Sequence, residues 1–120
     1  MNQQKNGFDF ETMRRAVEQL DADLLLSLYD DDAEMKVVNR STTPSAPREI
    51  QGREEIAEYL RDVCGRAMTH RIEREVLGED RIAFNEECEY PDGTKVLAST
   101  TLEVRDGKIV GQVNVEAWDE

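Results

Sequence analysis

Short turn signals divide the second half of the chain at nearly even spacing, and this pattern constrains the fold more than any other feature. The signals are Gly78-Glu79-Asp80, Pro91-Asp92-Gly93 and Asp106-Gly107. The segments around them have the composition of β-strands, so four strands are predicted, over residues 69–77, 81–90, 95–105 and 109–118. Consecutive strands joined by such short turns run antiparallel, and a four-stranded meander is therefore expected.

Helical periodicity marks the first half instead. Apolar residues recur at helical spacing from Phe10 to Leu20, behind the candidate N-cap Asp9. A second cap, Asp21, opens a shorter helix that is expected to include Tyr29. The acidic run Asp30-Asp31-Asp32 then ends that helix as a solvated loop, because its consecutive carboxylates lack the alternating spacing of a calcium site.

One strand, one loop and one helix complete the prediction. Residues 33–38 are expected to form a strand, and the Ser/Thr/Pro-rich segment 39–47 a mobile loop. A third helix is predicted over residues 54–64, where apolar residues again share one face, with Gly65 at its C-terminus. The order helix, helix, strand, helix and meander indicates an α+β fold. The 120 residues suit a single domain, in which residues 1–8 are expected to form a flexible N-terminal tail.

Composition excludes several partners. Fifteen basic and twenty-seven acidic residues give a net charge of −12, which repels nucleic-acid phosphates and anionic lipids. The longest apolar run, Leu24-Leu25-Leu26, is far too short to span a bilayer, and the N-terminus lacks a signal-peptide core. The sequence therefore predicts a cytoplasmic protein that binds neither nucleic acid nor membrane. Its two cysteines, Cys64 and Cys88, are interpreted as reduced thiols.

Three strings then suggest a family. They are Leu28-Tyr29-Asp30-Asp31-Asp32-Ala33, Ile50-Gln51-Gly52-Arg53-Glu54-Glu55-Ile56 and Asp106-Gly107-Lys108-Ile109. In this order and at this spacing, the chain resembles the nuclear transport factor 2-like superfamily, which includes SnoaL-like polyketide cyclases and ketosteroid isomerases. The resemblance covers nearly the whole chain and implies a cone-shaped α+β barrel, with helices packed on a curved, mostly antiparallel sheet. It does not imply one activity, because the superfamily hosts isomerases, cyclases, hydrolases and proteins without catalysis.

The catalytic residues of the ketosteroid isomerases are absent. At the positions of their general-base aspartate and oxyanion tyrosine this chain has Val37 and Met13, and the position of their protonated aspartate falls near Thr101. Hydrocarbon cannot accept a proton, and neither a thioether nor a threonine hydroxyl can polarise an enolate as those groups do. Ketosteroid isomerisation by that mechanism is therefore excluded. Tyr29 matches a supporting tyrosine of those enzymes, and its alternative role is that of a core residue.

The resemblance also implies which side chains face the interior of the barrel. Residues expected to line the pocket come from four strands: Met35, Val37, Ile82, Phe84, Glu86, Cys88, Leu97, Ser99, Thr101, Asn114, Glu116 and Trp118. Val113, Val115 and Ala117 then face outward. A second copy of the chain is expected to cover that apolar row, as in the dimers common in this superfamily.

Glu86 and Glu116 are the candidate catalytic residues. Two carboxylates in one poorly solvated cavity are costly unless they serve a purpose, and they suit the acid/base chemistry of enolisation, cyclisation or epoxide hydration. The alternative is that one or both lie at the sheet edge in solvent. Trp118, the only tryptophan, is expected to form a flat wall for a ring-bearing ligand or to seal the barrel as a core residue.

The remaining candidates are single residues. His70, the only histidine, can act as a base near neutral pH, but the alternative is a structural histidine. One histidine and two distant cysteines argue against a zinc site, and no sequence-near group activates Cys88 as a nucleophile. Neither a phosphate loop nor a dinucleotide motif occurs, so no cofactor is expected.

Three classes of function stay open at this point. The first is a cofactor-free isomerase, cyclase or hydrolase that acts on a small, apolar, ring-bearing molecule through carboxylate acid/base chemistry, which the paired glutamates favour. The second is a binding domain with the same pocket and no catalysis, which the loss of the isomerase residues favours. The third is a protein-interaction module that works through its outer sheet face.

Overall fold

A computed structural model describes residues 7–119 of the chain. Its three helices are α1 (Phe10–Glu18), α2 (Ala22–Leu26) and α3 (Gly52–Cys64). Its six strands are β1 (Tyr29–Val38), β2 (Arg48–Gln51), β3 (Thr69–Leu77), β4 (Arg81–Glu89), β5 (Lys95–Arg105) and β6 (Lys108–Trp118). Most of the tail expected over residues 1–8 lies outside the described residues. Phe8 is fully buried, however, so the tail does not extend that far.

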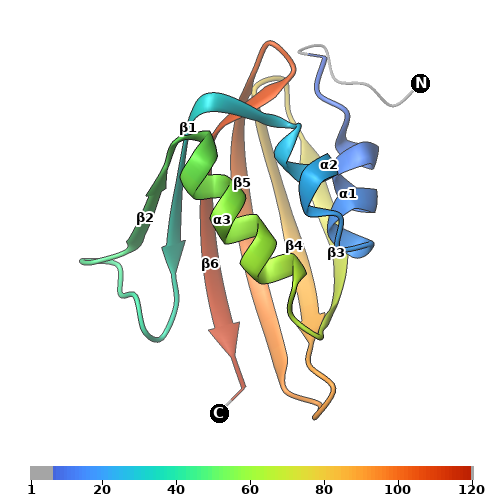
Figure 1. The fold of residues 1–120 in the computed structure, drawn as a ribbon, viewed down its shortest axis with the longest axis vertical. Coiled ribbons are helices and arrows are strands. Elements are labelled where there is room, and N and C mark those ends of the chain that lie inside the picture. The colour runs from blue at the N-terminus through green and yellow to red at the C-terminus, as the bar shows by residue number, and fades with distance from the viewer. Residues whose placement is uncertain (1–6, 120) are drawn as a thin grey trace.

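All six strands form one curved sheet, and the three helices cover one of its faces (Figure 1). The strand order is β2-β1-β6-β5-β4-β3, in which β3 to β6 are the predicted antiparallel meander. Strand β1 pairs with β6 in parallel and with β2 in antiparallel orientation. The predicted α+β class and the order of its elements are thus confirmed, with one additional short strand.

Local signals in the sequence account for several boundaries. Asp9 and Asp21 cap α1 and α2, each accepting a hydrogen bond from a backbone N–H three residues later. Asp106 and Gly107 both have positive φ, of 52° and 79°, as a two-residue type I′ hairpin turn between β5 and β6 requires. Gly52 has a φ of 83° where β2 passes into α3, a conformation that favours glycine.

Two predictions about the first half are wrong. Helix α2 ends at Leu26, and Tyr29 begins β1 instead of belonging to that helix. The acidic run is solvent-exposed at Asp31 and Asp32, as expected, but it lies within β1. Pairing of Tyr29 with Ile109 of β6 extends the strand by four residues, with an irregularity in register before Glu34. Sheet pairing here overrides the local sequence preference.

The loop between β1 and β2 is more anchored than its composition suggests. The Asn39 side chain accepts hydrogen bonds from the backbone N–H groups of Ser41 and Thr42. The Thr42 hydroxyl donates to the carbonyl of Val37, at 2.9 Å. These bonds tie residues 39–42 to the end of β1. Strand β2, just after this loop, was not predicted because it has only four residues.

The predicted phase of β5 is also wrong. Leu97, Ser99 and Thr101 are exposed on the outer face, and the inward residues are Val96, Ala98, Thr100, Leu102 and Val104. Directly paired residues of antiparallel strands share a face. Since Thr100 pairs with both Phe84 and Asn114, it must point inward with them. The error came from a family alignment shifted by one residue, which places a whole strand on the wrong face.

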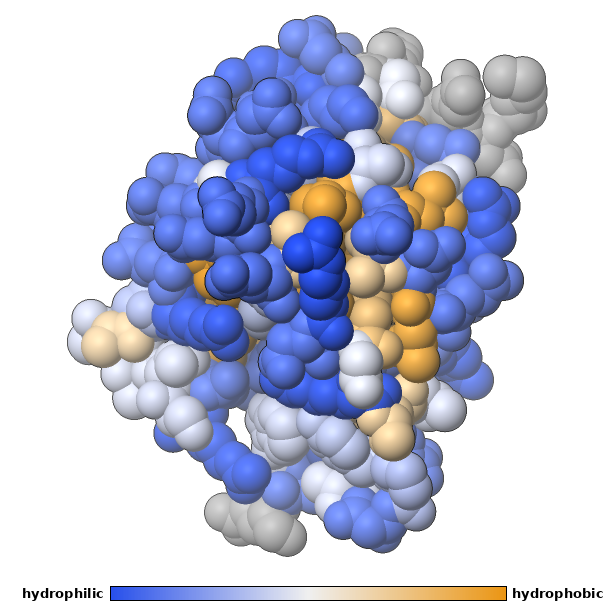
Figure 2. All heavy atoms as spheres, in the orientation of Figure 1, coloured by the Kyte–Doolittle hydropathy of each residue, from blue (hydrophilic) through white to orange (hydrophobic). Residues whose placement is uncertain are grey.

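The core lies between the sheet and the helices. It contains apolar residues of α1, α2 and α3 and the inward residues of the strands, and Phe10 meets Phe84 edge to face. The face that bears the helices is mostly hydrophilic, with apolar residues showing in a band along its middle (Figure 2). None of the helices within residues 7–119 is long and apolar enough to cross a membrane.

Candidate functional site

A cavity of about 90 Å³ lies between the inner face of the sheet and the helices. This volume is well above the roughly 10–15 Å³ that one water molecule needs. Eight of the predicted site residues line it: Tyr29, His70, Phe84, Glu86, Cys88, Asn114, Glu116 and Trp118. Met35 and Val37 are buried in the adjoining core, and Ser99 and Thr101 are outside on the exposed face.

Strand register places the cavity residues in rows across the sheet. One row runs from His70 through Cys88 and Val96 to Trp118. The next row places Glu86 and Glu116 on either side of Ala98. The two glutamates are thus two strands apart, or roughly 10 Å between backbones. They face one cavity, as predicted from the sequence, and the small Ala98 side chain leaves space between them.

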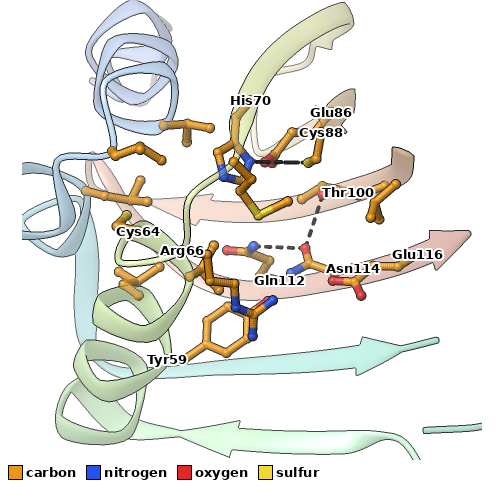
Figure 3. Close-up of a pocket in the computed structure, with 18 of the residues that line it drawn as sticks. Tyr59, Cys64, Arg66, His70, Glu86, Cys88, Thr100, Gln112, Asn114 and Glu116 are labelled. Atoms are coloured by element: carbon orange, nitrogen blue, oxygen red, sulfur yellow. Dashed lines mark hydrogen bonds and ion pairs between the residues drawn. The ribbon is translucent and has the colours of Figure 1, made fainter. Parts of the chain in front are cut away.

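At one side of the cavity, His70, Glu86 and Cys88 form a compact triad (Figure 3). His70 Nδ1 lies 2.5 Å from Glu86 Oε2 and 3.2 Å from Cys88 Sγ. The Cys88 thiol is also within 3.5 Å of Glu86 Oε2. His70 Nε2 is buried and has no hydrogen-bond partner among the described residues. Because both neighbours meet the same ring nitrogen, the triad is not a relay from carboxylate through imidazole to thiol.

A buried polar network crosses the floor of the cavity (Figure 3). The Tyr29 hydroxyl donates to Gln112 Oε1 at 2.5 Å, and Gln112 Nε2 donates to Asn114 Oδ1 at 2.9 Å. Thr100 Oγ1 donates to the same Asn114 oxygen at 3.1 Å. Asn114 Nδ2 lies 4.0 Å from the sulfur of Met35, a weak acceptor, and a hydrogen bond also links the Asn114 side chain to Tyr59. The Asn114 amide therefore connects this network to Tyr59 on α3.

Glu116 lies at the other side, held by two donors. Its Oε1 accepts hydrogen bonds from Trp118 Nε1 at 3.2 Å and from Asn39 Nδ2 at 3.1 Å. No hydrogen bond reaches its Oε2 within residues 7–119. The Trp118 ring packs near Tyr90, and the guanidinium of Arg40 lies over it, 5.1 Å from the ring centre. Glu116 is thus oriented, with one oxygen open to further contacts.

Several cavity groups are held in their neutral forms. Burial and the nearby Glu116 carboxylate raise the pKa of Tyr59 to about 12, against the effect of a hydrogen bond with Asn114. Burial, together with the charge of Glu86, raises the pKa of both Cys64 and Cys88. Burial likewise raises the pKa of Tyr29. At neutral pH these hydroxyls and thiols keep their protons and act as donors.

Sequence reasoning missed several cavity residues, among them four whose side chains carry nitrogen or oxygen: Tyr59, Arg66, Thr100 and Gln112. Tyr59 lies on the apolar face of α3, and helical periodicity does not separate a cavity residue from a core residue on that face. Thr100 and Gln112 follow from strand register, and the alternating apolar residues Val96, Ala98, Leu102 and Val104 gave a signal for the correct phase. Arg66 is the only Lys or Arg among the described residues that line the cavity. No pattern in the sequence indicated that Arg66 faces the cavity.

The fold and this cavity define the class of protein: a cone-shaped α+β domain with polar groups converging inside it. A model of the SnoaL-like domain matches residues 10–112. The chain belongs to the SnoaL-like family, within the nuclear transport factor 2-like superfamily. A comparison with curated protein sequences finds no match.

Solved structures agree on the fold. A nuclear transport factor 2-like protein of unknown function from Mesorhizobium loti has a TM-score of 0.76 at 19% identity, over 90% of this chain and 89% of that one. A proposed ketosteroid isomerase from Kribbella flavida has a TM-score of 0.75 at 14% identity, covering 92% of this chain and 75% of its own. SalBIII, an epoxide hydrolase/cyclase-like enzyme of pyran ring formation in the polyether salinomycin, has a TM-score of 0.70 at 18% identity, with coverages of 90% and 87%.

Proposed function

We propose that the cavity binds a small, largely apolar, ring-bearing molecule and that the chain catalyses proton transfer on it, with Glu116 as the acid/base group. The observation that carries this proposal is the position of Glu116. Its carboxylate lines the cavity, is oriented through Oε1 by Trp118 and Asn39, and leaves Oε2 without a partner in the described part of the chain. An oriented carboxylate beside an aromatic wall is suited to take a proton from a ring stacked on that wall.

Hydrogen-bond donors lie in the same cavity as Glu116. The Tyr59 hydroxyl, with its pKa of about 12, and the Asn114 amide are both neutral donors on the cavity wall. A ligand carbonyl or ether oxygen that accepts from these donors becomes polarised, which acidifies its neighbouring carbon or activates its C–O bond. Glu86, across Ala98 from Glu116, adds negative charge to the site as an electrostatic partner. The reaction class is enolisation, cyclisation or epoxide opening without an organic cofactor.

SalBIII supports this class, because a protein of the same fold is described as epoxide hydrolase/cyclase-like. Binding without catalysis is the second candidate. It is favoured by Met13, which lines the cavity at the position where ketosteroid isomerases carry their oxyanion tyrosine. The two candidates make the same prediction for binding and different predictions for turnover.

Proton exchange can separate the candidates. β-Tetralone, an aromatic ring joined to a ketone with exchangeable α-protons, is incubated with the protein in D₂O and followed by NMR, while quenching of the single tryptophan reports binding. We expect catalysed exchange in the wild type and a loss on the order of a hundredfold in Glu116→Gln. Glu103→Gln, which removes an exposed carboxylate from the outer face, is the matched control and should exchange like the wild type. Quenching with no catalysed exchange supports binding alone, and exchange that survives Glu116→Gln removes Glu116 from the mechanism.

A further inference from the structure

We propose that His70, Glu86 and Cys88 form a binding site for one divalent transition-metal ion of the Zn²⁺ type. The ligand atoms that these three side chains offer all lie within 4.8 Å of one another, on the wall of the cavity. The proposal rests on other observations than the proton-transfer function, which depends on Glu116, although both involve Glu86, whose charge a bound ion would neutralise. No zinc site was expected because the chain has one histidine and two cysteines that are distant in the sequence. The pairing of β3 with β4 brings His70 and Cys88 together in space.

The sheet brings the three ligands together by register alone. His70 on β3 is the direct cross-strand partner of Cys88 on β4, and Glu86 precedes Cys88 by two residues on the same strand face. All three side chains therefore project from adjacent positions of one rigid hairpin. Ligands on paired strands are held more precisely than ligands on loops.

The distances suit a tetrahedral ion. Zinc lies about 2.0–2.3 Å from nitrogen, oxygen and sulfur ligands, so two ligands of one ion are roughly 3.3–3.6 Å apart. The separations of Cys88 Sγ from His70 Nδ1 and from Glu86 Oε2 are 3.2 and 3.5 Å. Only the contact between His70 and Glu86, at 2.5 Å, must widen, by roughly 0.8 Å. Small rotations of the Glu86 side chain can provide this movement.

The charges also balance. Glu86 as a carboxylate and Cys88 as a thiolate carry two negative charges, which a divalent cation neutralises in a site where His70 and Cys88 are buried. Coordination releases the thiol proton of Cys88 to solvent. Coordination through Nδ1 places the proton of neutral His70 on Nε2, which has no partner in residues 7–119. The contact between Nδ1 and Glu86 is then replaced by a bond from each of these groups to the metal.

The donor set selects the kind of ion. A mixture of imidazole, thiolate and carboxylate suits zinc and its neighbours, whereas Ca²⁺ and Mg²⁺ require oxygen ligands. The Glu86 side chain retains 19% exposure, which provides a path of entry. Three protein ligands leave one tetrahedral position for water or a ligand of the cavity, as in sites where zinc takes part in a reaction.

Metal titration tests the site. The chelator-treated, desalted wild type is titrated with Zn²⁺ in a calorimeter, and we expect one ion per chain. Cys88→Ser and His70→Gln should each weaken binding at least tenfold. Cys64→Ser and Glu116→Gln, which change a thiol and a carboxylate elsewhere on the cavity wall, should bind as the wild type does. An absence of stoichiometric binding, or equal losses in the Cys64 and Cys88 variants, would overturn the proposal.

Cobalt provides a second measurement that does not depend on how well the ligand variants fold. Co²⁺ bound to a thiolate gives a charge-transfer absorption band in the near ultraviolet. We expect this band in the wild type and in Cys64→Ser, which assigns it to Cys88. A Co²⁺ complex without the band shows that the metal binds only the acidic surface of the protein, and the proposed site is then wrong.

Discussion

The inner and outer faces of the sheet are made by alternate residues of the same strands, and each face has residues of the kind expected on the other. The inner face buries three polar residues, His70, Thr100 and Asn114. The outer face leaves apolar residues in solvent, with exposures of 48% for Leu97 and 50% for Val115. A sheet with one solvated face is normally apolar inside and polar outside, and these residues are exceptions to that pattern on both faces. The inner polar residues line the proposed binding cavity, and the exposed apolar residues of the outer face are the basis of the predicted dimer.

The inner face is itself divided. Near the hairpin of Asp106 and Gly107 its residues are apolar and pack in the main core, as Leu102 and Ile109 do. Toward the opposite ends of the strands, polar side chains and the cavity replace this packing. The packed core and the cavity therefore occupy different ends of one face. A substitution at the packed end should affect folding, and one at the cavity end should affect chemistry.

The largest effect should come from two leucines on β5 that face opposite ways. Leu102→Ala empties a fully buried position and should lower the free energy of unfolding by about 2–5 kcal/mol. Leu97→Ala, the matched control on the outer face, should change it by no more than about 0.5 kcal/mol. Urea unfolding at low protein concentration measures both. Equal losses would contradict the assigned phase of β5.

A charge placed on the outer face should have the next largest effect. A homodimer through this face stays a prediction, and it rests on the exposed row of Val113, Val115 and Leu97. Val115→Glu would bury a carboxylate in that interface and should weaken dimerisation at least tenfold. Analytical ultracentrifugation measures this, with Ser45→Glu in the β1–β2 loop as the control of equal charge. A wild type that is monomeric throughout the concentration range would show that this face has a different partner or none.

The sequence predicted those parts of the fold that rest on local signals. Turn residues and periodicity identified the meander and the three helices, because each signal lies within a few residues of the element that it defines. Strand β2 was missed, since four residues carry too little pattern. Tyr29 was assigned to a helix because its true partner, Ile109, is eighty residues away.

The candidate site was predictable only in part, for the same physical reason. Glu86 and Glu116 were recognised as inward residues because the family resemblance implied the phase of β4 and β6. The triad was not, because His70 and Cys88 are eighteen residues apart and meet only through the pairing of β3 with β4. A shift of one residue in the assumed register of β5 was enough to exchange Thr100 for Thr101. Sites built across strands depend on register, which a single sequence specifies weakly.

The last expected effect is confined to high pH, concerns Tyr59 and tests how poorly solvated the inner face is. Burial and Glu116 raise its pKa to about 12 in the folded protein, while an unfolded tyrosine has a pKa of about 10. Between these values the unfolded chain releases the proton and the folded chain keeps it. The unfolded state then binds fewer protons, so the free energy of unfolding falls as the pH rises from about 10 to about 12. The two-unit difference corresponds to at most about 2.7 kcal/mol.

Tyr59→Phe removes the titrating hydroxyl and should make the free energy of unfolding fall less steeply with pH. Tyr29→Phe should have the same effect, because burial also raises the pKa of Tyr29. Urea unfolding at about pH 9 and about pH 11, followed by the fluorescence of Trp118, measures the slope. If Tyr59→Phe loses stability as steeply as the wild type, the hydroxyl is solvated. Tyr59 could then not serve as the neutral donor that the proposed proton transfer requires.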